Sequence, residues 1–234
     1  MTDAAGAASL RSDVLAALGQ VRDPELHEPV TTLGFVAACR VEDGHAEVRL
    51  RLPTYFCAPN FAFLMVADAQ EAVAAVAGVR EVRVVLEDHF AADAINAGVA
   101  ARAGFVESFE GYATAELDDL RRQFLRKAVL AGTDLVCRPL VAAGRGPEQL
   151  VGLDLGDVEP GPELDRLRAR RGELGLPAGD HAPLLVEVET GERLDADAVP
   201  LHLRRARLTQ VGVEANTAMC RGMLQHRYTI REGA

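Results

Sequence analysis

The sequence predicts an α+β domain, a small mixed sheet flanked by helices, followed by a mainly helical C-terminal extension. Residues 45–52 alternate apolar and charged side chains, which is the period of a half-buried strand. A second strand-like run, residues 35–42, precedes it, and Asp43-Gly44 between the two runs is a strong hairpin signal. After about residue 108 the chain changes character, and most runs there have helical periodicity.

The predicted elements of the N-terminal part follow in the order α-β-β-α-β. The first helix ends before Asp23-Pro24, because the residue before proline avoids the helical region. The hairpin comes next. Pro59 suits the first position of a second helix, which we expect to reach about residue 76. Residues 79–87 predict the third strand, and residues 91–103 predict a short helix.

We therefore expect two domains, residues 1–108 and residues 109–234. In the second, the run TAELDDLRRQFLRKAVLAG predicts an amphipathic helix with Thr114 as its cap. Further helices are predicted over residues 162–174 and 200–228, the latter as one helix or two. The run LLVEVETGERLD predicts either a hairpin or a single strand and its return.

The charge balance excludes some classes of function. The net charge is -10, from 25 basic and 35 acidic residues, so phosphate backbones repel the chain and nucleic acid is not an expected partner. No apolar run reaches the ~18–20 residues that span a membrane. The N-terminus lacks the pattern of a signal peptide. We expect a cytoplasmic protein whose cysteines stay reduced and can act as ligands or nucleophiles.

The cysteines lie at positions 39, 57, 137 and 220, without a CxxC pair. Cys57 stands just before a predicted helix, where backbone N–H groups and the helix dipole favour a thiolate; the alternative is a small buried side chain among Tyr55, Phe56 and Phe61. Cys137 and Cys220 each precede an arginine, which would also favour a thiolate. Cys39, in the middle of a strand, is expected to pack in the core.

The first hundred residues resemble a known family. Asp23-Pro24-Glu25 after the first helix, Leu33-Gly34-Phe35-Val36 at the start of the hairpin, and Thr54 followed by Cys57 carry the resemblance. This is the PaaD/SufT-like family of iron–sulfur cluster assembly proteins, known as domain of unknown function 59, and the resemblance covers about residues 10–90. One departure is that the family's Cys-Pro has become Cys57-Ala58-Pro59.

The resemblance implies a non-catalytic assembly or maturation factor rather than an enzyme. Such a factor would carry iron or an iron–sulfur cluster transiently to a client metalloenzyme, and PaaD-like relatives imply an oxygenase component as client. A homodimer is a further partner hypothesis. Two alternatives stay open: a metal-free adaptor or chaperone that binds an oxygenase component, and a thiol enzyme with Cys57 as nucleophile.

The extension adds two cysteines to the one that the family motif contains. We predict that Cys57, Cys137 and Cys220 converge on one metal or cluster, because soft thiolates suit iron–sulfur units and zinc. If only one of the two added thiols lies near Cys57, a histidine or carboxylate would complete the site. The candidates for that role are Asp23, Glu25 and His89.

Overall fold

The computed structural model describes residues 3–110, 113 and 117–232, and the chain divides into two compact units. The first unit is Met1–Asp118 together with Thr217–Ala234, and the second is Asp119–Asn216. The boundary predicted near residue 108 falls before this division. The last segment of the chain belongs to the first unit instead of the extension, and the two units are described separately below.

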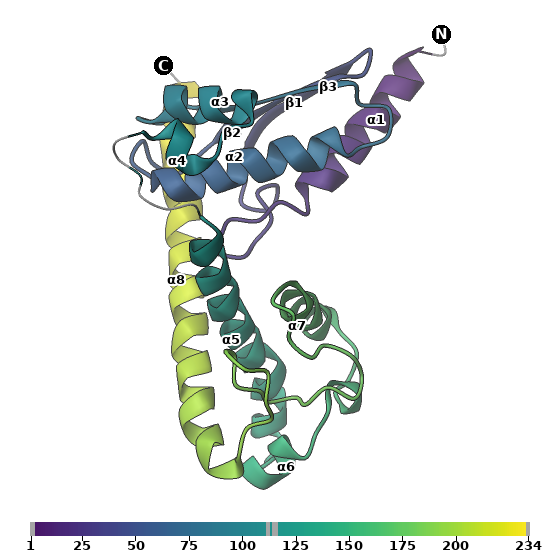
Figure 1. Cartoon of the computed structure of the whole chain (residues 1–234), viewed down its shortest axis with the longest axis vertical. Helices are drawn as coiled ribbons and strands as arrows, with labels where there is room; N and C mark the ends of the chain where they lie inside the picture. Colours follow the sequence, from purple (N-terminus) through teal and green to yellow (C-terminus); the bar gives the residue numbers. More distant parts are fainter. Residues whose placement is uncertain (1–2, 111–112, 114–116, 233–234) are drawn as a thin grey trace. The chain divides into compact units, whose positions relative to one another are not determined.

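The first unit has the predicted α+β order, shown in Figure 1. Its sheet has the strand order β1-β2-β3, in which β2 is antiparallel to β1 and parallel to β3, so the predicted mixed sheet is confirmed. Asp43 and Gly44 have φ angles of 48° and 75°, the positive values that a tight two-residue hairpin requires. The elements are α1 (Asp3–Leu18), β1 (Val36–Glu42), β2 (His45–Arg51), α2 (Pro59–Ala74), β3 (Glu81–Glu87), α3 (Ala92–Ala101) and α4 (Phe105–Ser108).

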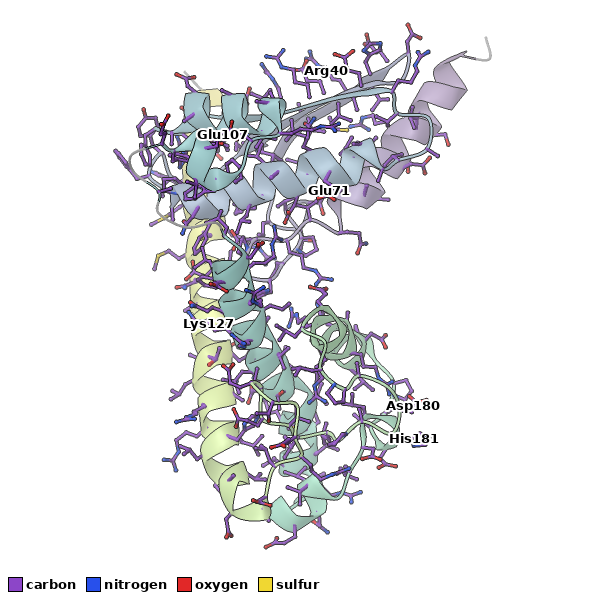
Figure 2. All side chains as sticks on the ribbon, in the orientation of Figure 1. Arg40, Glu71, Glu107, Lys127, Asp180 and His181 are labelled. Atoms are coloured by element: carbon purple, nitrogen blue, oxygen red, sulfur yellow. The ribbon has the colours of Figure 1, made fainter. Side chains whose placement is uncertain are left out.

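One face of the sheet is buried and the other is charged. Val48 and Leu50 of β2 are fully buried, and α2 contributes apolar side chains such as Val66 to the same core. The residues of β2 that alternate with these apolar ones are charged and lie on the opposite face of the sheet. Arg40 of β1 lies on that charged face, and Glu71 lies on α2, which covers the buried face (Figure 2). The alternation predicted from the sequence therefore decides which face of the sheet the helices cover.

Side-chain amides cover the outer edge of β3. Gln70 of α2 donates to the carbonyl oxygen of Val82 and accepts from the N–H of Val84, both at 3.0 Å. Asn96 of α3 accepts from the N–H of Leu86 at 2.8 Å and donates to its carbonyl oxygen at 3.0 Å. These amides occupy the backbone N–H and C=O groups that a fourth strand would otherwise bond. This edge of the sheet is therefore protected from pairing with a strand of another chain.

The end of the long helix α8 (Val199–Glu232) packs in the first unit. Arg227 donates to the carbonyl oxygens of Leu52 at 3.0 Å and Asp88 at 2.6 Å, and it also pairs with the Asp88 carboxylate at 3.1 Å. Leu224, one turn earlier, is buried against Gly34. The helix end is thereby fixed to the loops that follow β2 and β3.

The second unit is mainly helical, as predicted. Its elements are α5 (Asp118–Ala142), α6 (Pro147–Val151), the short 3-10 turns Leu155–Asp157 and Ala196–Ala198, α7 (Pro162–Glu173) and the first part of α8. Residues 184–195 form a hairpin-like return with a single bridge between Val186 and Arg193, without a regular strand. Thr114, the predicted helix cap, lies outside the described residues.

The run predicted as one or two helices near the C-terminus is the single helix α8, 34 residues long. Within the part of the chain that the structure describes, no helix combines sufficient length with sufficient apolar character to cross a membrane.

Candidate metal-binding site

Cys57 lies in the loop that connects β2 to α2, and its sulfur contacts the Thr54 hydroxyl. The distance from Thr54 Oγ1 to Cys57 Sγ is 3.4 Å, and the Phe56 N–H donates to the same hydroxyl oxygen at 3.2 Å. Either atom of the Thr54–Cys57 pair can donate while Cys57 carries its proton. Once Cys57 is a thiolate, only Thr54 can donate, so the hydroxyl is placed to stabilise the ionised sulfur.

The helix that follows begins at Pro59, with Ala58 at the N-cap position and no side-chain cap. Cys57 therefore stands one residue before the cap, as the additional alanine implies, and its side chain is half-buried. The Phe61 N–H near the start of the helix donates to the Asn60 side chain and to the Ala58 carbonyl. An effect of the helix terminus on the acidity of Cys57 stays a prediction.

His89 holds the Cys57 loop through both ring nitrogens. The Ala91 N–H donates to Nδ1 at 3.2 Å, so Nδ1 carries no proton, and Nε2–H donates to the carbonyl oxygen of Cys57 at 2.7 Å. Burial, the main cause, lowers the pKa of His89, and the Arg227 charge lowers it further. With both nitrogens occupied, His89 is a positioning residue for the loop instead of the additional metal ligand suggested by the sequence.

Cys220 shares one face of α8 with the residues that fix this helix to the first unit. Cys220, Leu224 and Arg227 follow the spacing i, i+4, i+7, which brings side chains to the same side of a helix. The intervening Arg221 pairs with Glu28 in the loop after α1. These anchors direct Cys220 towards the loops of the first unit, while the neighbouring Met219 is exposed.

The charges around Cys220 are acidic. Burial, and then the negative charges of Asp23, Cys57 and Glu25, raise the pKa of the Cys220 thiol to about 11. The charges of two carboxyl groups and a second thiol, from two other segments of the chain, therefore act on Cys220. Among residues 3–110, 113 and 117–232, no histidine or carboxylate joins two thiols in a group able to hold a metal, so the predicted two-thiolate site with a third side-chain ligand is not formed.

Asp23 also has a structural role. Its Oδ1 accepts from the N–H groups of Glu25 at 2.9 Å and Leu26 at 2.8 Å, so the side chain caps the turn that follows α1. Asp23 is 8% exposed, and burial raises the pKa of its carboxyl group. The Oδ1 atom of Asp23 is thus already occupied by two backbone hydrogen bonds.

Cys137 belongs to the hydrophobic core of the second unit. It is 1% exposed, and burial raises the pKa of its thiol to about 12. No group of three or more histidine, cysteine, aspartate or glutamate side chains able to hold a metal is formed among residues 3–110, 113 and 117–232. The structure thus leaves Cys137 enclosed in its own core and does not assemble the predicted three-thiol site.

The arginines that follow two of the cysteines do not stabilise thiolates, so that prediction is wrong. Arg138 pairs with Asp134, and Arg221 pairs with Glu28. On a helix, residues i and i+1 point in different directions, so adjacency in sequence does not bring their side chains together. Cys39 is 8% exposed in β1, and burial raises the pKa of its thiol, as expected for a packing residue.

An exposed aromatic cluster beside Cys57 was missed by the sequence analysis. Tyr55, Phe56 and Phe90 are 45%, 76% and 49% exposed, and their ring centroids lie 5.0 to 6.3 Å apart. The Phe90 N–H donates to the Tyr55 carbonyl oxygen at 3.1 Å, which joins the two loops. The alternative in which Tyr55 and Phe56 bury Cys57 is therefore wrong, because both rings face solvent.

A polar hollow of the second unit has a volume of about 520 Å³, and its lining includes four aspartates. Asp154 pairs with Arg193, and Asp180, labelled with His181 in Figure 2, pairs with Arg168. Because arginines already engage two of its carboxylates, this hollow is a weaker metal-site candidate than the one around Cys57.

Residues 11–84 match a protein-family model described as iron–sulfur cluster assembly protein. The match covers the sheet into β3, together with α2 and Cys57, about a third of the chain. No curated protein matches the chain. The resemblance to an iron–sulfur cluster assembly family is confirmed over these residues, and it supports a general role in iron–sulfur cluster assembly.

Proposed function

We propose that this protein is a non-catalytic maturation factor that carries iron or an iron–sulfur cluster on Cys57 and Cys220 and passes it to a client metalloenzyme. The family match supports the general role. The observation that supports the specific proposal is that the charge of Cys57, in the family-matching region, contributes after burial and Asp23 to the raised pKa of Cys220, and that both cysteines belong to the first unit.

The electrostatics around Cys220 favour a cation over nucleophilic chemistry. Burial first, and then the charges of Asp23 and Glu25, raise the pKa of Cys220, which makes it a poor nucleophile near neutral pH. The same negative charges attract iron, and a bound metal displaces the thiol proton. These charges support metal binding at Cys220, and they do not bear on the alternative in which Cys57 is the nucleophile of a thiol enzyme.

The donor set suits a carrier that must release its cargo. Thiolates bind iron–sulfur units well, and two of them from one chain leave iron coordination positions for other ligands. A client can then supply its own ligands in those positions before the carrier thiols leave. We propose a metalloenzyme, such as an oxygenase component, as this client.

The proposal is tested by loading the full chain anaerobically with ferrous iron and sulfide. We expect visible absorption bands and bound iron in the parent protein, and loss of both in Cys57→Ser and in Cys220→Ser. Cys39→Ala is the matched control, because it removes a thiol outside the site and should keep the cargo. Transfer is then followed by mixing the loaded protein with an iron-free cluster-accepting protein. If the double variant Cys57→Ser/Cys220→Ser binds as much iron as the parent, the proposal fails.

A further inference from the structure

The first part of α8 exposes a set of apolar and basic side chains, the α8 strip, defined as Leu201, Arg204, Arg205, Leu208 and Val211. The three apolar members are 52%, 67% and 44% exposed, and both arginines are exposed. Their spacing of i, i+3, i+4, i+7 and i+10 brings them to one side of the helix. All five residues belong to the second unit.

The other side of this part of α8 already packs in the second unit. Leu203 contacts the hydrophobic core of this unit, and Ala206 and Gln210 are buried. Arg207 pairs with Asp134 of α5, the helix that runs beside it in Figure 1. The apolar residues of the α8 strip are therefore additional to the face that holds the helix in its own unit, and such exposed apolar surface is typical of an interaction site.

The charges of the α8 strip are available to a partner. Within the part of the chain that the structure describes, neither Arg204 nor Arg205 forms an ion pair, in contrast to Arg207. Residues 199–216 contain three arginines and one glutamate, whereas the whole chain has a net charge of -10. A guanidinium binds a carboxylate through two parallel hydrogen bonds, and its aliphatic stem packs on apolar groups. The chemistry of the strip thus suits a surface that is apolar and edged by carboxylates.

We propose that the α8 strip is a docking surface for a partner protein that presents an apolar helix face edged by aspartates or glutamates. Leu201, Leu208 and Val211 pack between the apolar side chains of that helix, and Arg204 and Arg205 pair with its carboxylates. The strip extends over about 15 Å of helix, which suits a transient contact better than a permanent one. This inference is independent of the metal cargo and of the cysteines.

Two other occupants fit the charges less well. A second copy of the chain would bring two basic strips together, and like charges at a contact oppose association. A membrane-surface helix keeps its arginines on a polar face apart from its apolar face, whereas Arg204 and Arg205 lie among the apolar residues of the strip. The net charge of the chain also opposes its approach to an anionic lipid surface.

The test uses the full chain and two labelled synthetic peptides. The acidic probe is a helical peptide of about 18 residues, or five turns, with leucines at the spacing of the strip and glutamates beside them. The basic probe has a lysine in place of each glutamate. Fluorescence anisotropy measures binding at low and high salt. We expect saturable binding of the acidic probe that weakens with salt, and at least tenfold weaker binding of the basic probe.

Variants of the chain assign the binding to the strip. Leu208→Ser should weaken binding of the acidic probe about tenfold, through the loss of apolar area that the complex buries. Arg204→Gln/Arg205→Gln should weaken binding at low salt and remove most of its salt dependence. Phe56→Ser, at a 76% exposed apolar residue of the first unit, is the matched control and should bind like the parent.

Absence of binding by the acidic probe, or equal affinity for the two probes, would overturn the proposal. Equal affinity of the parent and Leu208→Ser for the acidic probe would overturn it as well. Light scattering and flotation with vesicles of phosphatidylcholine and phosphatidylserine test the other occupants. A dimer, or vesicle binding, that Leu208→Ser abolishes would assign the strip to a second copy or to a membrane instead. None of these results depends on iron, so they leave the proposed function to its own test.

Discussion

Arg227, close to the C-terminus, donates a hydrogen bond of 3.0 Å to the carbonyl oxygen of Leu52, which lies 175 residues earlier in the chain. Its second hydrogen bond, to the Asp88 carbonyl, joins the loop after β2 to the loop after β3. Those two loops carry Cys57 and His89, so the end of α8 fixes the surroundings of the thiol.

Arg227→Met should loosen the Cys57 loop. The side chain makes two charged hydrogen bonds to backbone carbonyls, so its loss is expected to lower the free energy of unfolding by about 2–3 kcal/mol. Denaturant unfolding measures this change. Arg221→Met is the control on the same helix: its partly exposed ion pair with Glu28 should contribute no more than about 1 kcal/mol. Equal losses in both variants would argue against a specific role of Arg227.

His89 should make the stability sensitive to mild acid. The folded protein holds its pKa below the usual value, whereas in the unfolded chain the ring takes up a proton near pH 6.5. The unfolded state therefore binds more protons as pH falls below about 6.5, and the free energy of unfolding should fall with it until the folded-state pKa is passed.

The measurement is denaturant unfolding at about pH 7.5 and 5.5. His89→Gln should reduce the difference between the two values, although His202, whose pKa burial also lowers, keeps part of it. An unchanged difference in His89→Gln would show that burial does not hold the His89 ring neutral in the folded protein.

Cys57 should be the first thiol to be alkylated in the folded, metal-free protein. Its side chain is half-buried, whereas burial raises the pKa of Cys39 and raises that of Cys137 to about 12. Burial limits the access of the reagent to Cys39 and Cys137, and the raised pKa lowers the fraction of each thiol that is present as the reactive thiolate. Mass spectrometry of peptides after brief alkylation gives the order. Labelling of Cys39 at the same rate as Cys57 would contradict the placement of these two residues.

The sequence could predict the sheet and Cys57 because their signals are local. The alternation in residues 45–52 and the Asp43-Gly44 pair define the hairpin, and Thr54 with Cys57 follows the family motif. The place of Cys220 depends on contacts between α8 and loops far away in the chain, which no local pattern encodes. The exposure of Phe56 was not predictable for a similar reason, since an aromatic residue is usually buried and only the folded loop shows otherwise.

The affinity for iron should rise with pH. Because the folded protein keeps the proton on Cys220 up to about pH 11, a metal must displace it at neutral pH. Binding therefore releases protons. For each thiol proton that is displaced, the apparent affinity rises about tenfold for every unit by which the pH increases, as long as the pH is below the pKa of that thiol. Competition with a chelator between about pH 6.5 and 8 measures this slope. An apparent affinity of the parent protein that does not change over this range would contradict the displacement of a proton from Cys220.

Gln70→Ala together with Asn96→Ala should expose the edge of β3. The variant loses four hydrogen bonds to strand groups, so we expect lower stability and concentration-dependent self-association. Light scattering over a range of protein concentrations detects the association. Glu71→Ala, the exposed neighbour of Gln70 on α2, is the control and should behave like the parent. Indistinguishable behaviour of the three proteins would show that the amides do not protect this edge.

The central claim, that Cys57 and Cys220 hold the cargo, is tested most directly on protein isolated anaerobically as the cell makes it. Iron and acid-labile sulfide are measured per chain in the parent and in Cys57→Ser/Cys220→Ser, with Cys39→Ala as control. We predict iron and sulfide in the parent and the control, and loss of both in the double variant. Equal iron and sulfide content in the parent and the double variant would contradict the claim.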